Sequence, residues 1–67
     1  MLTTKQEELY GVIKDFIKEN GYAPTVRELT RITNKKSPAT IYNMMQQLIN
    51  KGYISTDGKA RTIKILK

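Results

Sequence analysis

Three helix-start signals stand within the first 38 residues of this 67-residue chain, and they constrain its fold more than any other feature. Two are capping boxes, in which a Thr side chain and a Glu side chain three residues later each accept a backbone N–H of the other residue. They are Thr4-Lys5-Gln6-Glu7 and Thr25-Val26-Arg27-Glu28. The third is Ser37-Pro38, because Ser is a strong N-cap and Pro suits the first helical position. The chain is therefore expected to hold three short helices.

Apolar spacing and stop signals set the extent of each helix. The first is expected over about residues 4–19 and ends at Asn20-Gly21, since glycine accepts the left-handed conformation that closes a helix. The second has about two turns and stops near Thr33-Asn34. The third covers residues 37–50, before Gly52. Its inward face is expected to carry the following apolar residues: Ile41, Met44 or Met45, Leu48 and Ile49.

The remaining segment predicts a β-hairpin. Residues 53–55 and 60–66 are the expected strands, and Asp57-Gly58 between them suits the turn types that match strand twist. Ile63 and Ile65 alternate with polar residues, as in a strand with one buried face. Three helices and a two-stranded wing make a mainly α fold with a small β-hairpin, the winged helix-turn-helix. Residues 1–67 are expected to form one such domain.

The net positive charge lies entirely in the second half of the chain. Residues 1–34 hold equal numbers of cations and anions, whereas residues 35–67 hold seven cations and one anion and so carry the whole net charge of +6. A one-sided positive field attracts a polyanion, most often nucleic acid or an anionic membrane surface. In a winged helix-turn-helix, this half contains the helix that enters the major groove and the wing. Double-stranded DNA is therefore the expected partner.

The start of the third helix has the residues that such a helix needs. Ser37, Thr40, Tyr42 and Asn43 offer the hydrogen-bond donors and acceptors that distinguish base edges in the major groove. Phosphate contacts would hold the helix in position. The residues expected to make them are Lys35, Lys36, Gln47, Arg27, Lys59 and Arg61.

Other classes of function have little support. The chain has neither cysteine nor histidine, which excludes disulfides and imidazole chemistry, and no nucleophile has an evident base. We expect no enzyme, no cofactor and no metal. No apolar run approaches the roughly 20 residues of a membrane span, and the N-terminus lacks the apolar core of a signal peptide. The expected location is the cytoplasm, without a membrane partner.

The order of several short motifs resembles the N-terminal DNA-binding domain of the LexA family, the bacterial SOS repressors. The motifs are Leu2-Thr3 with Lys5-Gln6, Gly21-Tyr22-Ala23-Pro24-Thr25, Arg27-Glu28-Leu29, Ser37-Pro38, Leu48 with Lys51-Gly52-Tyr53-Ile54, and Arg61-Thr62-Ile63-Lys64-Ile65-Leu66. The resemblance implies a repressor that binds operator half-sites as a symmetric pair. A homodimer on a palindromic site is the corresponding expectation.

The resemblance also implies which residues contact bases. Carried over by position, these sites fall on Ser37, Ala39, Thr40, Tyr42 and Asn43. The family often has a polar residue in place of Ala39 and acidic residues in place of Tyr42 and Asn43. A carboxylate accepts from cytosine N4, whereas Asn pairs with adenine and the Thr methyl packs on thymine. The expected operator therefore differs from the usual SOS box.

Full-length members of that family carry a self-cleaving C-terminal domain with a Ser-Lys dyad, and this sequence ends at Lys67. A small phage- or plasmid-borne regulator, associated with the bacterial nucleoid, fits such a chain, as does a fragment of a longer repressor. The alternative function is a protein-interaction module, like an antirepressor, that binds another regulator through the uncharged third helix. RNA recognition is a weaker alternative, because no aromatic platform faces solvent.

Overall fold

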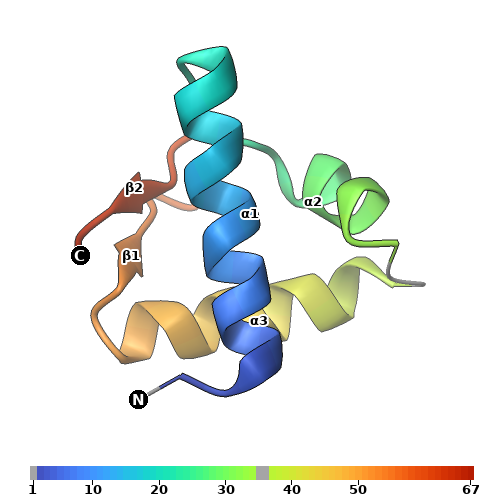
Figure 1. Ribbon diagram of the computed structural model, residues 1–67, viewed down its shortest axis with the longest axis vertical. Helices are drawn as coiled ribbons and strands as arrows, with labels where there is room; N and C mark the ends of the chain where they lie inside the picture. The colour runs from blue at the N-terminus through green and yellow to red at the C-terminus, as the bar shows by residue number, and fades with distance from the viewer. Residues whose placement is uncertain (1, 35–36) are drawn as a thin grey trace.

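The computed structural model of the chain describes residues 2–34 and 37–67, and these residues form the predicted winged helix-turn-helix (Figure 1). The elements follow the predicted order: α1 (Thr4–Asn20), α2 (Val26–Ile32), α3 (Pro38–Asn50), β1 (Ile54–Ser55) and β2 (Lys64–Ile65). The two strands are antiparallel, with Ile54 opposite Ile65 and Ser55 opposite Lys64. In Figure 1, α1 crosses in front of α3, with α2 on one side and the hairpin on the other.

The start of α1 differs from the prediction by one residue. Thr3, not Thr4, is the N-cap, and its hydroxyl accepts the N–H of Gln6 at 3.2 Å. The Gln6 side chain closes the box by accepting the N–H of Thr3 at 3.0 Å. Both registers fit the sequence pattern, and burial decides between them, because Gln6 is buried while Glu7 stays exposed. Predicting Thr4 and Glu7 as the capping pair was therefore wrong.

The other helix boundaries confirm the predictions. Thr25 accepts the N–H of Glu28 at 3.1 Å, and the Glu28 carboxylate accepts the N–H of Thr25 at 2.9 Å. Ser37 caps α3, where its hydroxyl accepts the N–H of Ala39 at 3.2 Å. Gly21 and Gly52 follow α1 and α3 with φ of 78° and 80°, the left-handed conformation that ends a helix. These caps satisfy backbone groups that helix ends leave unpaired.

The core lies where α1, α2, α3 and the hairpin meet. It consists of the following buried side chains: Leu9, Ile13, Ala23, Leu29, Ile41, Met45, Leu48, Ile54 and Ile63. Met45 rather than Met44 occupies the inner position on α3, so one of the two sequence alternatives is selected. Because every element contributes to this core, the orientation of α3 depends on the packing of the whole domain.

The hairpin is shorter than predicted, because each strand keeps only two residues. Residues 56–63 form a loop, here called the wing loop, whose hydrogen bonds centre on Thr62. The Thr62 hydroxyl donates to the carbonyl of Lys59 at 2.7 Å and accepts the N–H of Asp57 at 3.2 Å. Such local side-chain bonds compete with ladder pairing. In the described part of the chain, no helix is long and apolar enough to cross a membrane.

Candidate nucleic-acid interface

The outer face of α3 is uncharged, polar and exposed. Ile41, Met45 and Leu48 point into the core. Because successive side chains on a helix are rotated by about 100°, the opposite face consists of a stripe of four residues: Ala39, Asn43, Gln46 and Asn50. All four are exposed. No residue of α3 carries a charge, so this face offers neutral amide donors and acceptors to whatever lies against it.

Four of the five predicted base-contacting residues are exposed on this face or its flanks. Asn43 and Ala39 lie on the stripe, whereas Tyr42 and Thr40 lie on its two sides. The Tyr42 side chain is 61% exposed and is therefore not part of the core. Ser37 is half-buried, and its hydroxyl caps the helix. Whether these residues touch bases stays a prediction.

Gln46 is not among the predicted base-contacting residues, since the sequence favoured a phosphate contact and a solvated surface position equally for its side chain. It lies three residues after Asn43 and seven after Ala39, and those two spacings return to the same face of a helix. A search for polar residues at these spacings from Asn43 would have found it. The exposed amide of Gln46 extends the stripe by one turn beyond the predicted residues.

The predicted phosphate-contacting residues lie in different surroundings. Lys35 and Lys36 fall outside the described residues. Arg27 and Lys59 are exposed and line a groove of about 270 Å³, here called the wing groove, between the start of α2, Tyr42 of α3 and the wing loop. Two cations from different elements and a phenol in the same lining suit a phosphate. Their contact with DNA stays a prediction.

Gln47 is exposed and hydrogen-bonded within the fold. Its side-chain oxygen accepts a bond from the Gln6 amide, and the Lys51 ammonium donates to the Gln6 oxygen at 2.9 Å. This network ties the start of α1 to the C-terminal half of α3. A phosphate contact by Gln47 stays a prediction, and it would use the amide nitrogen.

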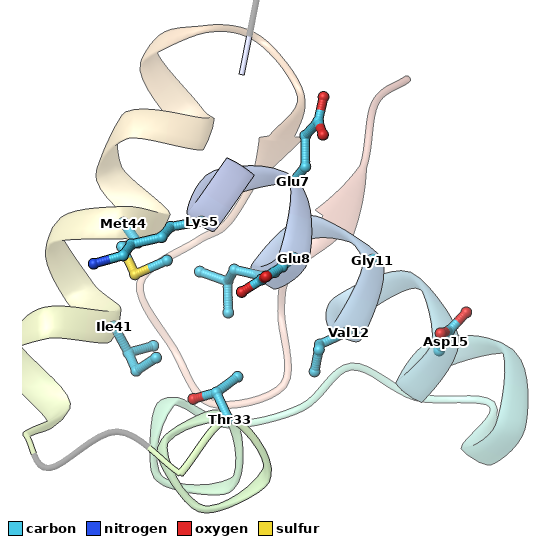
Figure 2. Close-up of a pocket in the computed structure, with 10 residues that line it drawn as sticks. Lys5, Glu7, Glu8, Gly11, Val12, Asp15, Thr33, Ile41 and Met44 are labelled. Atoms are coloured by element: carbon cyan, nitrogen blue, oxygen red, sulfur yellow. The ribbon is translucent and has the colours of Figure 1, made fainter. Parts of the chain in front are cut away.

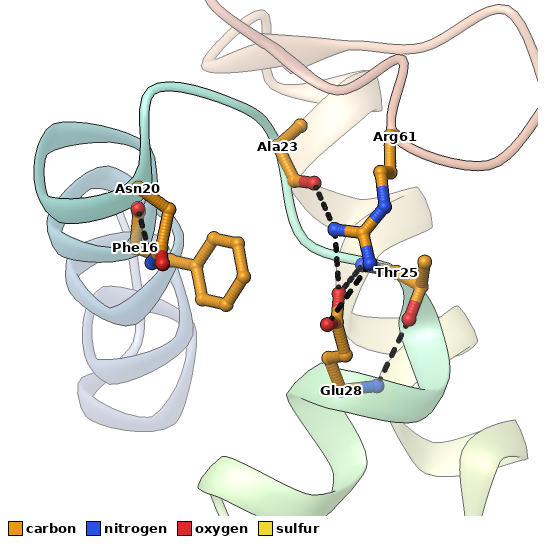
Figure 3. A network of polar contacts seen from close by, with 6 residues as sticks. All are labelled: Phe16, Asn20, Ala23, Thr25, Glu28 and Arg61. Carbon is orange, nitrogen blue, oxygen red and sulfur yellow. Dashed lines mark hydrogen bonds and ion pairs between the residues drawn. The ribbon is translucent and has the colours of Figure 1, made fainter.

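Arg61 is turned toward α2 (Figure 3). Its guanidinium donates to the carbonyl oxygen of Ala23 at 3.1 Å and forms an ion pair with Glu28, with nitrogen and oxygen 2.9 Å apart. The same group lies over the Tyr22 ring, 4.7 Å from its centroid. The backbone of Arg61 is left-handed, with φ of 60°, which for a residue other than glycine costs about 1–2 kcal/mol.

A second groove, of about 390 Å³, lies beside α1 (Figure 2). Its floor is apolar and includes Leu9, Val12, Ile41 and Met44. Its rim carries three carboxylates and one ammonium, from Glu7, Glu8, Asp15 and Lys5. This groove is larger than the wing groove, but its negative rim repels phosphate. The charges therefore favour a polyanion at the wing groove over the groove beside α1.

Comparison with known proteins shows the family to which this chain is similar. The family model described as the LexA DNA binding domain matches residues 1–62. A transcription regulator LexA from Synechocystis is 46% identical over 66 residues, which cover 97% of this chain and 32% of the relative. LexA repressors from Caldicellulosiruptor saccharolyticus and Staphylococcus aureus are 47% and 38% identical over 66 residues each, covering 97% of this chain. The chain spans about a third of the length of these relatives.

Proposed function

The chain belongs to the family of LexA DNA-binding domains, and we propose that it is a sequence-specific, double-stranded DNA-binding regulator that represses transcription by occupying an operator. The observation that carries the proposal is the exposed, uncharged outer face of α3 beside a groove walled by cations. A helix of this kind fits the major groove, where base edges display their donors and acceptors. The domain over residues 1–67 is proposed to act as one DNA-binding unit.

The side chains of α3 have distinct proposed roles. Asn43 is exposed in the middle of the stripe, and an Asn amide matches the N6 and N7 atoms of adenine. The Thr40 methyl suits a thymine methyl, and the exposed Tyr42 hydroxyl can reach a base or a phosphate. Ala39 leaves room for the helix to approach the bases closely. Ser37 sits where the helix N-terminus favours an anion.

Phosphate contacts are proposed to come from the elements beside α3. Arg27 of α2 and Lys59 of the wing loop both line the wing groove, where they could bind the DNA backbone. Lys35, Lys36 and Gln47 complete the proposed set. These contacts set the register of the helix without reading sequence. One domain of this size offers modest contact area, so tight binding calls for two copies on a palindrome with half-sites one helical turn apart.

The alternative function, a protein-interaction module that binds another regulator, draws no support from the comparisons. The matched relatives are named repressors and a transcription regulator, and the matched family is named for DNA binding. The cations of the wing groove also suit phosphates better than a neutral protein groove. DNA binding is therefore the function that the site supports best.

The proposal is tested by selecting binding sites from a random duplex pool at near-physiological salt. The wild-type chain is expected to enrich a short motif, and the motif's symmetry reports whether one copy or two bind. Asn43→Ala is expected to lose preference at one base pair by about 1–3 kcal/mol, or about 5- to 150-fold in affinity. Asn20→Ala, an exposed asparagine at the end of α1, is the matched control and should select the wild-type motif.

Two outcomes would overturn the proposal. One is a wild-type selection that enriches no motif while binding disappears as salt rises, since charge alone would then explain binding. The other is an Asn43→Ala variant that selects the wild-type motif with unchanged strength, since α3 would then not read that base.

A further inference from the structure

The wing loop is joined to the start of α2 through the Arg61 side chain (Figure 3). One guanidinium nitrogen donates to the Ala23 carbonyl at 3.1 Å and pairs with one Glu28 oxygen at 2.9 Å. The other nitrogen donates to the second Glu28 oxygen at 3.1 Å. Both prongs of the guanidinium therefore meet both oxygens of one carboxylate, a geometry that fixes direction as well as distance.

The carboxylate that receives Arg61 is itself held in place. Glu28 accepts the N–H of Thr25 at 2.9 Å, so its side chain is fixed by the capping box that begins α2. The guanidinium also lies over the Tyr22 ring, 4.7 Å from its centroid, within reach of a cation–π contact. The Arg61 guanidinium is thus held by groups of α2 and of the segment just before it.

The pairing of the strands supplies little orientation to the loop. β1 and β2 share two residue pairs, and eight residues separate the strands. Arg61 adopts a left-handed backbone conformation, which persists when surrounding contacts impose it. The contacts of its side chain with Ala23, Glu28 and Tyr22 are of that kind.

We infer that Arg61 and Glu28 form a clamp that positions the wing, so that Arg61 acts on DNA by holding Lys59 in the wing groove beside α2 rather than by contacting a phosphate itself. Lys59, Ala60 and Arg61 follow one another in the loop, and all three line the wing groove with Arg27 and Tyr42. This role replaces the phosphate contact predicted for Arg61 from sequence. It rests on the proposed function, because placing Lys59 matters to binding only if DNA is the ligand.

Glu28→Gln distinguishes a positioning role of Arg61 from a direct phosphate contact, because the two roles predict opposite changes in DNA affinity. The substitution removes a negative charge, so electrostatic attraction alone predicts tighter binding to DNA. If Arg61 contacted a phosphate directly, releasing it from Glu28 would act in the same direction. If the clamp positions Lys59, Glu28→Gln loosens the wing and weakens binding instead. Arg61→Lys keeps the positive charge but not the two-pronged geometry, and should also weaken binding.

The experiment measures duplex affinity against salt on the motif selected by the wild-type chain. Glu28→Gln and Arg61→Lys are expected to lower the magnitude of the salt slope by about 0.9 and to weaken binding about fivefold near 0.15 M salt, as for the loss of one phosphate contact. Lys59→Gln is the matched variant that removes the contact and keeps the clamp. In the double variant, the loss of affinity from Lys59→Gln should not add to that from Arg61→Lys, because both substitutions remove the same Lys59 contact. All variants should select the wild-type motif.

Folding is followed in the same variants, because a clamp variant can lose more than the wing. Amide hydrogen exchange in Glu28→Gln should rise within residues 56–63 while the amides of α3 keep their protection. Tyr22→Leu is the second variant. It removes the ring that contacts Arg61 and leaves the Ala23 carbonyl and the Glu28 carboxylate in place. It should weaken DNA binding less than Glu28→Gln does.

The inference is overturned if Glu28→Gln binds as tightly as the wild type or more tightly, or if the losses from Lys59→Gln and Arg61→Lys add. Unfolding of α3 together with the wing loop in both clamp variants would likewise overturn it, because the pair would then support the whole fold. A wild-type chain that selects no motif defeats the proposed function. If the wild type selects a motif but Glu28→Gln leaves the slope of log affinity against log salt unchanged, the clamp is wrong and the proposed function stands.

Discussion

Glu28 shows how one side chain can serve two structural purposes. It closes the capping box of α2 and receives the guanidinium of Arg61, 33 residues later in the chain. The backbone hydrogen bond from Thr25, followed by the hydrogen bond from Arg61, lowers the pKa of the Glu28 carboxyl below its ordinary value. A sequence pattern identifies the first partner, because it is three residues away, but not the second.

The lowered pKa predicts an acid-dependent loss of stability. A carboxylate whose pKa is depressed by folding stabilises the fold when ionised, so its contribution is fully present above its unfolded pKa and is lost as pH falls through the folded value. The free energy of unfolding of the wild type should therefore exceed that of Glu28→Gln at pH 7. The gap should narrow below about pH 4, in the range where glutamate protonates. Denaturant unfolding of both proteins across this range measures it, and a gap that persists unchanged in acid would contradict the prediction.

At the scale of elements, α3 divides its contribution sharply between two faces. Its inner face supplies three buried core residues, and its outer face carries amides and no charge. The charges that would attract DNA stand on α2 and the wing loop, where they cannot dictate which bases face the helix. On the proposed function, this separation would let base preference and overall affinity change independently.

The start of α1 provides a prediction at the same scale. Because the capping box runs from Thr3 to Gln6, Thr3→Ala should lower the free energy of unfolding by about 1 kcal/mol, the usual effect of losing a cap. Thr4→Ala is the matched control one residue away, and it should have little effect, since Thr4 is exposed in the first turn. Thermal or denaturant unfolding of the pair decides the matter. Equal losses, or a larger loss for Thr4→Ala, would show that the cap lies elsewhere.

At the scale of the whole molecule, the two grooves carry opposite charge. The groove beside α1 is rimmed by Glu7, Glu8 and Asp15, whereas the wing groove is walled by Arg27 and Lys59. A polyanion is repelled from one and attracted to the other, so on the proposed function this charge distribution would orient the domain on DNA.

This asymmetry predicts that cations of equal charge contribute unequally to DNA binding. Lys59→Gln should lower the magnitude of the slope of log affinity against log salt by about 0.9, the value for one neutralised phosphate. Lys18→Gln is the control, because Lys18 lies in the last turn of α1, in the half of the chain whose charges balance. Titrations of duplex DNA at several salt concentrations measure both slopes. Similar slopes for the two variants would mean that net charge, not its placement, governs binding.

Patterns in the sequence are enough to predict the number, order and approximate limits of the helices, and the net positive charge of the second half. These features are local. A cap acts over three residues, a left-handed glycine ends the helix beside it, and the 3.6-residue period shows which face of α3 is apolar. The exposed positions of Asn43 and Thr40 follow from the same period, so much of the candidate site could be predicted without coordinates.

Tertiary structure alone decided between patterns that the sequence left equivalent. Burial of Gln6 set the register of the first cap, and the fit of the core selected Met45 over Met44. The strands are shorter than predicted because the wing loop makes its own hydrogen bonds. Arg61 pairs with Glu28 of α2. These four features share one physical reason. Each depends on residues that are distant in sequence or that compete for one position, and only the packing of the folded chain determines which of those residues are close enough to interact.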